Sequence, residues 1–125
     1  MKAGLDRIET GILGEKLALG VLKKRGYRIL ETNFRCREGE IDIVAKQRDW
    51  LVFVEVRAKR SLAFGTPEES LSPRKQARVR RAAKRCLQMH KGLPESWRID
   101  FVGIELSQEG KAERITVIES AVGER

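Results

Sequence analysis

Two carboxylates interrupt two apolar segments near the middle of the chain. Asp42 lies within the apolar residues 41–45, and Glu55 lies within residues 51–56. A carboxylate with apolar neighbours on both sides loses hydration and needs a partner, such as a basic side chain or a metal ion. Two carboxylates and a cation such as Arg57 at one edge of a sheet can hold a hard divalent metal with open positions. The competing interpretation is a structural ion pair, for example between Glu55 and Arg57.

The segments that carry these acids have the composition of strands. Residues 41–45 and 51–56 are rich in β-branched and aromatic side chains and are short enough to be buried strands. The polar residues between them suit a hairpin loop. Because side chains alternate along a strand, Glu55 and Arg57 share one face. Pairing the two strands as a hairpin could bring Asp42 near Glu55.

The composition bounds the class of protein and its partners. A chain of 125 residues is long enough for one domain with a core, so we expect a single domain over residues 1–125 with its core at about residues 11–119. The net charge of +8 favours a polyanionic partner, either nucleic acid or an acidic membrane surface. No apolar run is long enough to span a membrane, and no signal peptide is evident. With two cysteines and one histidine a zinc site is not expected, and we predict a cytoplasmic protein with reduced thiols.

The first helix is predicted over about residues 11–25. Thr10 can cap its start, and Gly26 can end it, which leaves residues 1–10 as a poorly fixed arm. Glu15 has two interpretations: an exposed acid favoured by the helix dipole, or a third carboxylate leaning toward the sheet. Three apolar residues at a spacing of four are expected to face the core: Leu13, Leu17 and Val21.

A second helix begins at Ser72-Pro73, with serine as the cap and proline at the first helical position, and is expected to run to about His90. Its basic residues are Arg74, Lys75, Arg78, Arg80, Arg81, Lys84 and Arg85, and no acid occurs between Ser70 and Pro94. A charge run is usually a solvated face. A helix with seven cations repels itself, however, so an anionic partner is the better interpretation, with these side chains on phosphates. The apolar face is expected to comprise Val79, Ala82, Ala83, Cys86 and Leu87.

Three further strands are predicted, over residues 27–34, 97–106 and 114–119, with Ile29 and Leu30 as core candidates in the first. Residues 58–72 form a loop longer than usual, which often marks a binding loop. Asp100 lies in an apolar stretch, either as a group that supports the site or as the partner of an arginine such as Arg98.

The order of helix, three strands, helix and one or two strands, with Glu15, Asp42, Glu55 and Arg57 placed as they are, resembles the restriction-endonuclease-like nuclease superfamily. More closely, the chain resembles the YraN family of small bacterial proteins, which is similar to archaeal Holliday junction resolvases. This resemblance implies an α/β fold with an αβββαβ core, in which helices flank a mixed central sheet. It rests on Gly14-Glu15 with Ala18, Asn33-Phe34-Arg35, Gly39-Glu40-Ile41-Asp42, Phe53-Val54-Glu55-Val56-Arg57, Pro73-Arg74-Lys75-Gln76 and Arg98-Ile99-Asp100.

The resemblance also implies roles for these residues. Asp42 and Glu55 would bind Mg²⁺ or Mn²⁺, with the Val56 carbonyl as a third ligand. Glu15 would complete the site or hold a metal-bound water. Arg57 stands where the superfamily has a lysine; arginine keeps its proton and cannot act as a base, although it can stabilise charge building on a phosphate. Lys59, two residues further on the same strand face, could supply the lysine instead.

Three functions therefore compete. The first is a metal-dependent nuclease that cleaves DNA phosphodiesters, with structure-selective, junction-like DNA expected from the resemblance and a homodimer expected by analogy. The second is a nucleic-acid-binding module on the nuclease fold with weak or no catalysis, which Arg57 supports. The third is a structural or assembly protein that docks its basic helix on an acidic protein or ribosomal RNA. For the first two, the expected nucleic-acid contacts are Lys59, Arg74, Lys75, Gln76, Arg78, Arg81 and Arg85.

Overall fold

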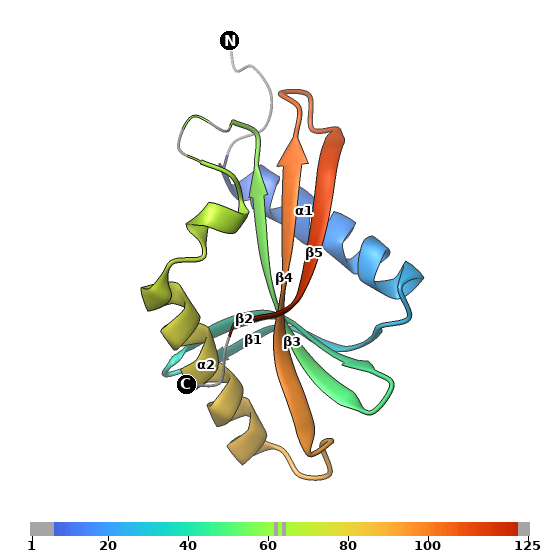
Figure 1. The fold of residues 1–125 in the computed structure, drawn as a ribbon, viewed down its shortest axis with the longest axis vertical. Helices are drawn as coiled ribbons and strands as arrows, with labels where there is room; N and C mark the ends of the chain where they lie inside the picture. The colour runs from blue at the N-terminus through green and yellow to red at the C-terminus, as the bar shows by residue number, and fades with distance from the viewer. Residues whose placement is uncertain (1–6, 62, 64, 123–125) are drawn as a thin grey trace.

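The computed structural model describes residues 7–61, 63 and 65–122. Two helices and five strands follow one another in the order that the sequence predicts, with a second strand after the last helix (Figure 1). The elements are α1 (Arg7–Lys24), β1 (Arg28–Cys36), β2 (Gly39–Gln47), β3 (Trp50–Lys59), the short 3-10 helix η1 (Glu68–Ser70), α2 (Pro73–Met89), β4 (Ser96–Leu106) and β5 (Ala112–Val122). The predicted α/β class with an αβββαβ order is confirmed.

One mixed sheet holds all five strands in the order β1-β2-β3-β4-β5. The β3 and β4 strands are parallel, and the other three neighbouring pairs are antiparallel. A parallel pair needs a long crossover, and α2 lies in the connection between β3 and β4. The predicted mixed sheet flanked by helices is therefore confirmed.

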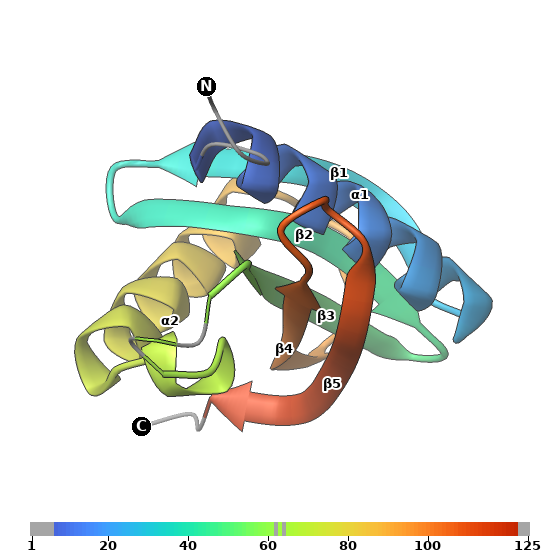
Figure 2. The ribbon, with the colours of Figure 1, turned by 90° about the horizontal axis from the view of Figure 1, so that it is seen from above.

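Each helix covers a different cluster of buried residues (Figure 2). The cluster beneath α1 includes Ala18, Leu22 and Val54. The cluster beneath α2 includes Val79 and Phe53. Since Phe53 and Val54 are consecutive on β3, their side chains point to opposite faces, and the sheet has a core on both sides.

The first helix begins earlier than predicted. Residues 7–10 are helical, so Thr10 lies inside α1 and is buried, and its prediction as the cap was wrong; residues 1–6 of the predicted arm lie outside the described residues. The buried residues of α1 are Thr10, Gly14, Ala18 and Leu22. The predicted Leu13 and Leu17 are half-buried and pack against the core cluster beneath α1, as expected, whereas Val21 is half-buried and is not part of that packing.

Small residues explain this displaced face. A Cβ added at Gly14 would lie 2.5 Å from the Cβ of Ala58, so only glycine allows α1 to approach β3 this closely. The end of α1 was predicted correctly. Gly26 has a φ of +88°, its amide donates to the Lys23 carbonyl, and the Tyr27 amide donates to the Leu22 carbonyl. This is the pattern of a glycine-terminated helix.

The second helix was predicted nearly residue for residue. The Ser72 hydroxyl accepts a hydrogen bond from the Lys75 amide, and the helix ends at Met89 with His90 as its C-terminal cap. Four of the five predicted apolar residues are buried, and Leu87 is half-buried. No helix of the described part of the chain is long and apolar enough to cross a membrane.

The first strand departs from prediction in its core face. Leu30 is 45 % exposed, so its assignment to the core was wrong, whereas Ile29 packs against the cluster beneath α1. The register of β1 against β2 shifts between Ile29 and Glu31, which interrupts the alternation of faces. The predicted loop over residues 58–72 is also shorter, because β3 continues through Lys59.

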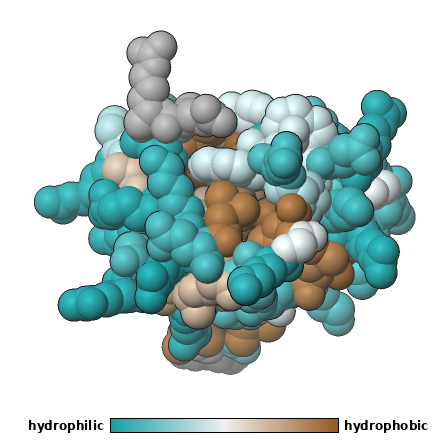
Figure 3. All heavy atoms as spheres, turned by 90° about the horizontal axis from the view of Figure 1, so that it is seen from below, coloured by the Kyte–Doolittle hydropathy of each residue, from teal (hydrophilic) through white to brown (hydrophobic). Residues whose placement is uncertain are grey.

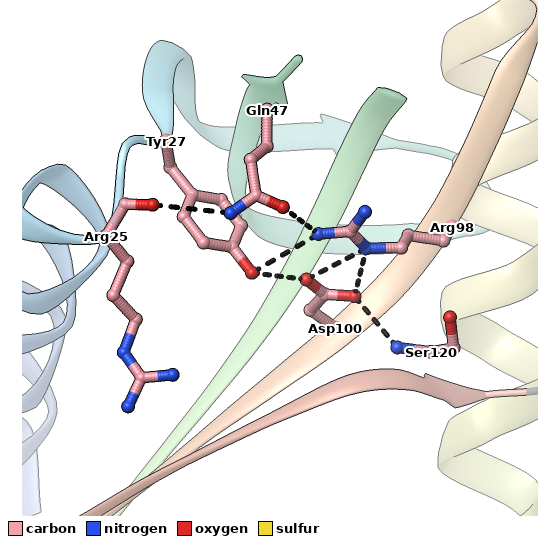
Figure 4. A network of polar contacts seen from close by, with 6 residues as sticks. All are labelled: Arg25, Tyr27, Gln47, Arg98, Asp100 and Ser120. Carbon is pink, nitrogen blue, oxygen red and sulfur yellow. Dashed lines mark hydrogen bonds and ion pairs between the residues drawn. The ribbon is translucent and has the colours of Figure 1, made fainter. Parts of the chain in front are cut away.

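Asp100 is the fully buried acid of the sheet (Figure 4). Its carboxylate accepts hydrogen bonds from the Tyr27 hydroxyl at 2.7 Å, the Arg98 Nε at 2.9 Å and the Ser120 amide at 2.9 Å. Arg98 also donates to the Gln47 side chain, 2.5 Å away. Burial, together with the hydrogen bond to Asp100, raises the pKa of Tyr27 to about 12. Of the two interpretations of Asp100, pairing with Arg98 is the one that the structure supports.

The surface is hydrophilic over most of the end seen from below, as the net charge predicts (Figure 3). An area of apolar side chains lies near the middle of that view. It is surrounded by hydrophilic side chains.

Candidate metal and nucleic-acid site

The sheet divides at the position of the two central acids. The β2 and β3 strands pair from Gln47 and Trp50 as far as Ile43 and Val54. Beyond that point β2 pairs only with β1, and β3 pairs only with β4. The two strands therefore separate there, which Figure 1 shows as the β1–β2 hairpin turning away from β3 and β4. We call this point the fork.

Asp42 and Glu55, the acid pair, are the first residues of each strand beyond the fork. One carboxylate oxygen of Asp42 accepts a hydrogen bond from the Val56 amide at 2.7 Å. The side chain therefore binds a backbone amide of β3 at a position where the β2 backbone is no longer paired with β3. The Glu55 carboxyl is hydrogen-bonded to Asp42. The prediction that a hairpin would bring the two acids together is confirmed.

The acid pair has an unusual electrostatic state. Burial, followed by the negative charge of Asp42 and the hydrogen bond between them, raises the pKa of Glu55 to about 9. Arg57 and Lys75 oppose this rise. Two neighbouring carboxylates cannot both ionise cheaply, and the negative charge of Asp42 therefore favours the protonated form of Glu55.

Basic side chains from both sides surround the pair. Arg57 lies two residues along β3, and Lys75 reaches over from the first turn of α2. Burial and then the positive charge of Arg57 lower the pKa of Lys75, while Glu55 acts in the opposite direction. Lys75 also lines both hollows at the fork, although the sequence placed it only among the nucleic-acid contacts.

Two connected hollows meet at the fork. The small cavity, about 460 Å³, extends toward α2 and is lined by Glu55, Arg78 and Val79 among others. The long groove, about 1030 Å³, extends toward α1 and is lined by Glu15 and Asn33 among others. Five residues line both: Arg35, Asp42, Val56, Arg57 and Lys75. The acids thus lie between two basic hollows open to a ligand.

The donors at the fork fit one divalent cation. Asp42 and Glu55 supply carboxylate oxygens, which Mg²⁺ and Mn²⁺ prefer, and a cation would replace the proton that burial and Asp42 favour on Glu55. Glu15 lines the long groove, where its carboxylate accepts a hydrogen bond from Asn33 at 3.4 Å. Among the described residues no group of three acid, histidine or cysteine side chains converges in a geometry that could hold a metal. Glu15 therefore stays a prediction as a group that completes the site.

The other predicted contacts fall into two groups. Lys59, Lys75 and Arg78 line one or both hollows, and the Lys59 ammonium donates to the Gly65 carbonyl at 3.4 Å. The remaining residues lie elsewhere: the Gln76 amide donates to the Leu71 carbonyl at 3.0 Å, and Arg74, Arg81 and Arg85 are exposed and line neither hollow.

Several residues of the site were missed from the sequence. Arg35 lines both hollows, and Arg7 and Arg60 line the long groove. A signal for Arg35 existed, because on β1 it flanks the buried Phe34 and lies opposite Glu40 of β2. Arg7 lay in the predicted arm, so nothing placed it near the acids.

Known proteins are similar to this chain along most of its length. The model of the "Uncharacterised protein family UPF0102" matches residues 14–104, which include both acids, Arg57 and Lys75. A UPF0102 protein of Dehalococcoides mccartyi strain BAV1 is 48 % identical over 119 residues, covering 95 % of this chain and 97 % of its own. Another, from Caldicellulosiruptor saccharolyticus, is 39 % identical over 117 residues, covering 94 % and 99 %. A third, from Moorella thermoacetica, is 43 % identical over 117 residues, covering 94 % and 98 %.

Proposed function

This chain belongs to the uncharacterised protein family UPF0102, the YraN-like family that its motifs resemble, and from its own site we propose that it is a divalent-metal-dependent nuclease acting on DNA. The observation that carries the proposal is the meeting of two carboxylates, Asp42 and Glu55, where β2 and β3 separate, beside hollows lined by arginine and lysine. The pKa of Glu55 is raised there. Such a pair accepts a divalent cation, and its surroundings accept phosphates.

In this proposal the acids at the fork are the metal ligands. Asp42 and Glu55 hold Mg²⁺ or Mn²⁺, with the Val56 carbonyl as the third protein ligand expected from the resemblance. When bound, the metal supplies Lewis-acid stabilisation and lowers the pKa of a coordinated water. The hydrogen bond from the Val56 amide fixes the Asp42 carboxylate in place. Glu15 lies further along the groove and would position water at its edge.

The basic residues at the fork act on the phosphate. Arg57 keeps its proton and stabilises charge on the phosphate oxygens. β3 has no lysine at position 57, and Lys75 of α2 takes that role. Lys75, Glu55 and Arg57 line the same small cavity, and both charges act on the pKa of Lys75. Lys59 is a weaker candidate for that role, because its ammonium is directed to the Gly65 carbonyl.

A cleavage assay tests this function. Purified protein is incubated with labelled branched, single-stranded and duplex DNA in Mg²⁺ or Mn²⁺, alongside Asp42→Asn and Glu55→Gln. We expect wild-type cleavage that EDTA abolishes and that each substitution lowers at least about a hundredfold, since each removes a metal ligand. Cleavage at the wild-type rate by either folded variant would contradict the proposed site.

The second candidate function is a nucleic-acid-binding module without catalysis, and Arg57 is the observation that favours it. It predicts DNA binding that falls steeply with salt and needs no divalent metal. No cleavage of any substrate, together with equal affinity of wild type and Asp42→Asn in EDTA, would decide for this function.

A further inference from the structure

The α1 end of the long groove carries an apolar surface that the nuclease chemistry does not use. Ile8 is 75 % exposed and Ile12 is 65 % exposed, and both line the groove. They are four residues apart on α1, so their side chains lie next to each other on one face of the helix. Asp42 of the acid pair lines the same groove, together with Arg57 and Lys75.

The helix surface beside these two isoleucines is open. Gly11 also lines the groove, and a Cβ added there would meet no atom within 4 Å. Packing within the chain therefore does not require glycine at this position, in contrast to Gly14, whose added Cβ would meet Ala58 at 2.5 Å. A flat ligand can lie against the helix at Gly11.

Charge indicates which ligand fits. Besides the isoleucines, the groove is lined by Arg7, Arg35, Arg57 and Lys75, which suits a phosphate backbone. A second copy of this chain would bring the same cations face to face. A flat membrane surface would not reach acids recessed in a groove. Bases in a duplex are stacked and paired, whereas unpaired bases present apolar faces to a protein.

Resting on the proposed function, we propose that unpaired nucleobases of a bound DNA strand pack against Ile8 and Ile12 while the cations at the fork hold its backbone. The protein then selects DNA with unpaired nucleotides beside the phosphate at the acid pair, such as an overhang, flap or open branch. The α1 end of the groove binds unpaired bases, and the cations at the fork bind the phosphate backbone.

Binding to two hairpin DNAs, one blunt and one with a single-stranded overhang, tests this inference. Fluorescence polarisation is recorded in Ca²⁺ so that affinity is measured apart from cleavage. We expect the wild type to prefer the overhang. The double variant I8S/I12S should lose at least about tenfold in affinity for it, because burial of both isoleucines against the bases is lost, with blunt-hairpin affinity unchanged. Ile118→Ser, an exposed isoleucine on β5 outside the groove, is the matched control and should change neither affinity.

A second pair of variants keeps the helix intact. Gly11→Ala places a methyl group in the groove, and Gly20→Ala places one on the same helix outside it, where it also meets nothing. We expect Gly11→Ala alone to weaken overhang binding, about threefold. Fluorescence of 2-aminopurine in the overhang should respond to wild type and Gly20→Ala alike.

The outcomes separate the two proposals. Equal affinity for both hairpins, or an equal loss for both in I8S/I12S, would overturn the role of the isoleucines and leave the nuclease proposal standing. A wild-type dimer that I8S/I12S converts to monomer with unchanged DNA affinity would assign this surface to a second copy and also overturn it. Binding to neither hairpin would overturn both proposals.

Discussion

The same sheet carries the buried acid Asp100 with its hydrogen-bond donors, and the acid pair Asp42 and Glu55. We call these two groups the acid clusters, and their surroundings are opposite. Asp100 is fully buried, and its carboxylate accepts hydrogen bonds from a tyrosine, an arginine and a backbone amide (Figure 4). Asp42 and Glu55 meet each other at the fork and face open hollows. The hydrogen bonds of Asp100 all come from within the chain, whereas Asp42 and Glu55 are open to a ligand. The comparison teaches that partners, rather than burial alone, distinguish an acid satisfied within the chain from one available to a ligand.

Removing the Asp100 carboxylate should have the largest effect on stability. Asp100→Ala leaves the Arg98 guanidinium buried without its partner, and we expect a loss of about 3–5 kcal/mol in the free energy of unfolding. Urea denaturation measures it. The double variant R98M/D100A should lose less than the sum of the single variants, because it leaves no unpaired charge. A decrease of less than about 1 kcal/mol in the free energy of unfolding of Asp100→Ala would contradict a structural role for Asp100, and with it the distinction between the two acid clusters.

In the metal-free protein, removing the charge of Glu55 from the acid pair should raise the free energy of unfolding, whereas removing Asp100 lowers it. The folded state holds the Glu55 proton up to a pKa of about 9, whereas the unfolded chain releases it near 4.5. The folded state therefore binds more protons between these values, and stability falls as pH rises from about 4.5 to 9. We expect Glu55→Gln to be more stable than wild type at pH 8 by on the order of 1 kcal/mol or more, and equal to it near pH 4.

Urea denaturation in EDTA at the two pH values measures this difference. Mg²⁺ should remove much of it, because the metal stabilises the ionised pair of the wild type and not the variant. A wild type equally stable at both pH values, with no gain in Glu55→Gln, would show that the pair is an ordinary solvated one.

The smallest expected effect concerns the cations of α2. Arg78 lines the small cavity, whereas Arg81 is exposed and lines neither hollow. We expect Arg78→Ala to weaken DNA binding about fivefold and to lower the salt dependence of log K by about 1, and Arg81→Ala to change affinity less than about twofold. Titrations at several salt concentrations measure both. Equal effects would mean that DNA follows the outer face of α2 rather than the fork.

The sequence predicted the acid pair because its signal is local. Apolar runs of five or six residues identify β2 and β3, and the polar residues between them suit a hairpin that could bring Asp42 near Glu55. The structure has this hairpin, with Gln47 paired to Trp50 at its end. Ser72-Pro73 likewise gave the start of α2 from adjacent residues. Where neighbours along the chain decide the structure, the pattern was enough.

The errors arise where distant residues decide. Thr10 carries a good capping side chain, yet α1 begins before it, and the threonine is buried inside the helix rather than placed at its start. The core face of α1 follows Gly14 because of Ala58, a contact across 44 positions of the chain that no helical pattern records. Leu30 is exposed because of a register shift at its neighbours.

The site shows the same limit. Lys75 lines the same cavity as Glu55 because α2 packs against β1 and β2, so the sequence placed it on a basic helix without linking it to the acid pair. Ile8 lay outside the predicted helix, and no local pattern linked it to a groove.

The most direct test of the central claim is calorimetric titration of Mn²⁺ into the protein bound to a short non-cleavable DNA, for wild type, Asp42→Asn and Glu55→Gln. Repeating it in buffers of different ionisation enthalpy counts the protons released. The account predicts wild-type binding at pH 7 with release of about one proton, and loss of that binding in both variants. Wild-type binding that persists in both variants, or no binding with the DNA present, would contradict a metal site at the fork.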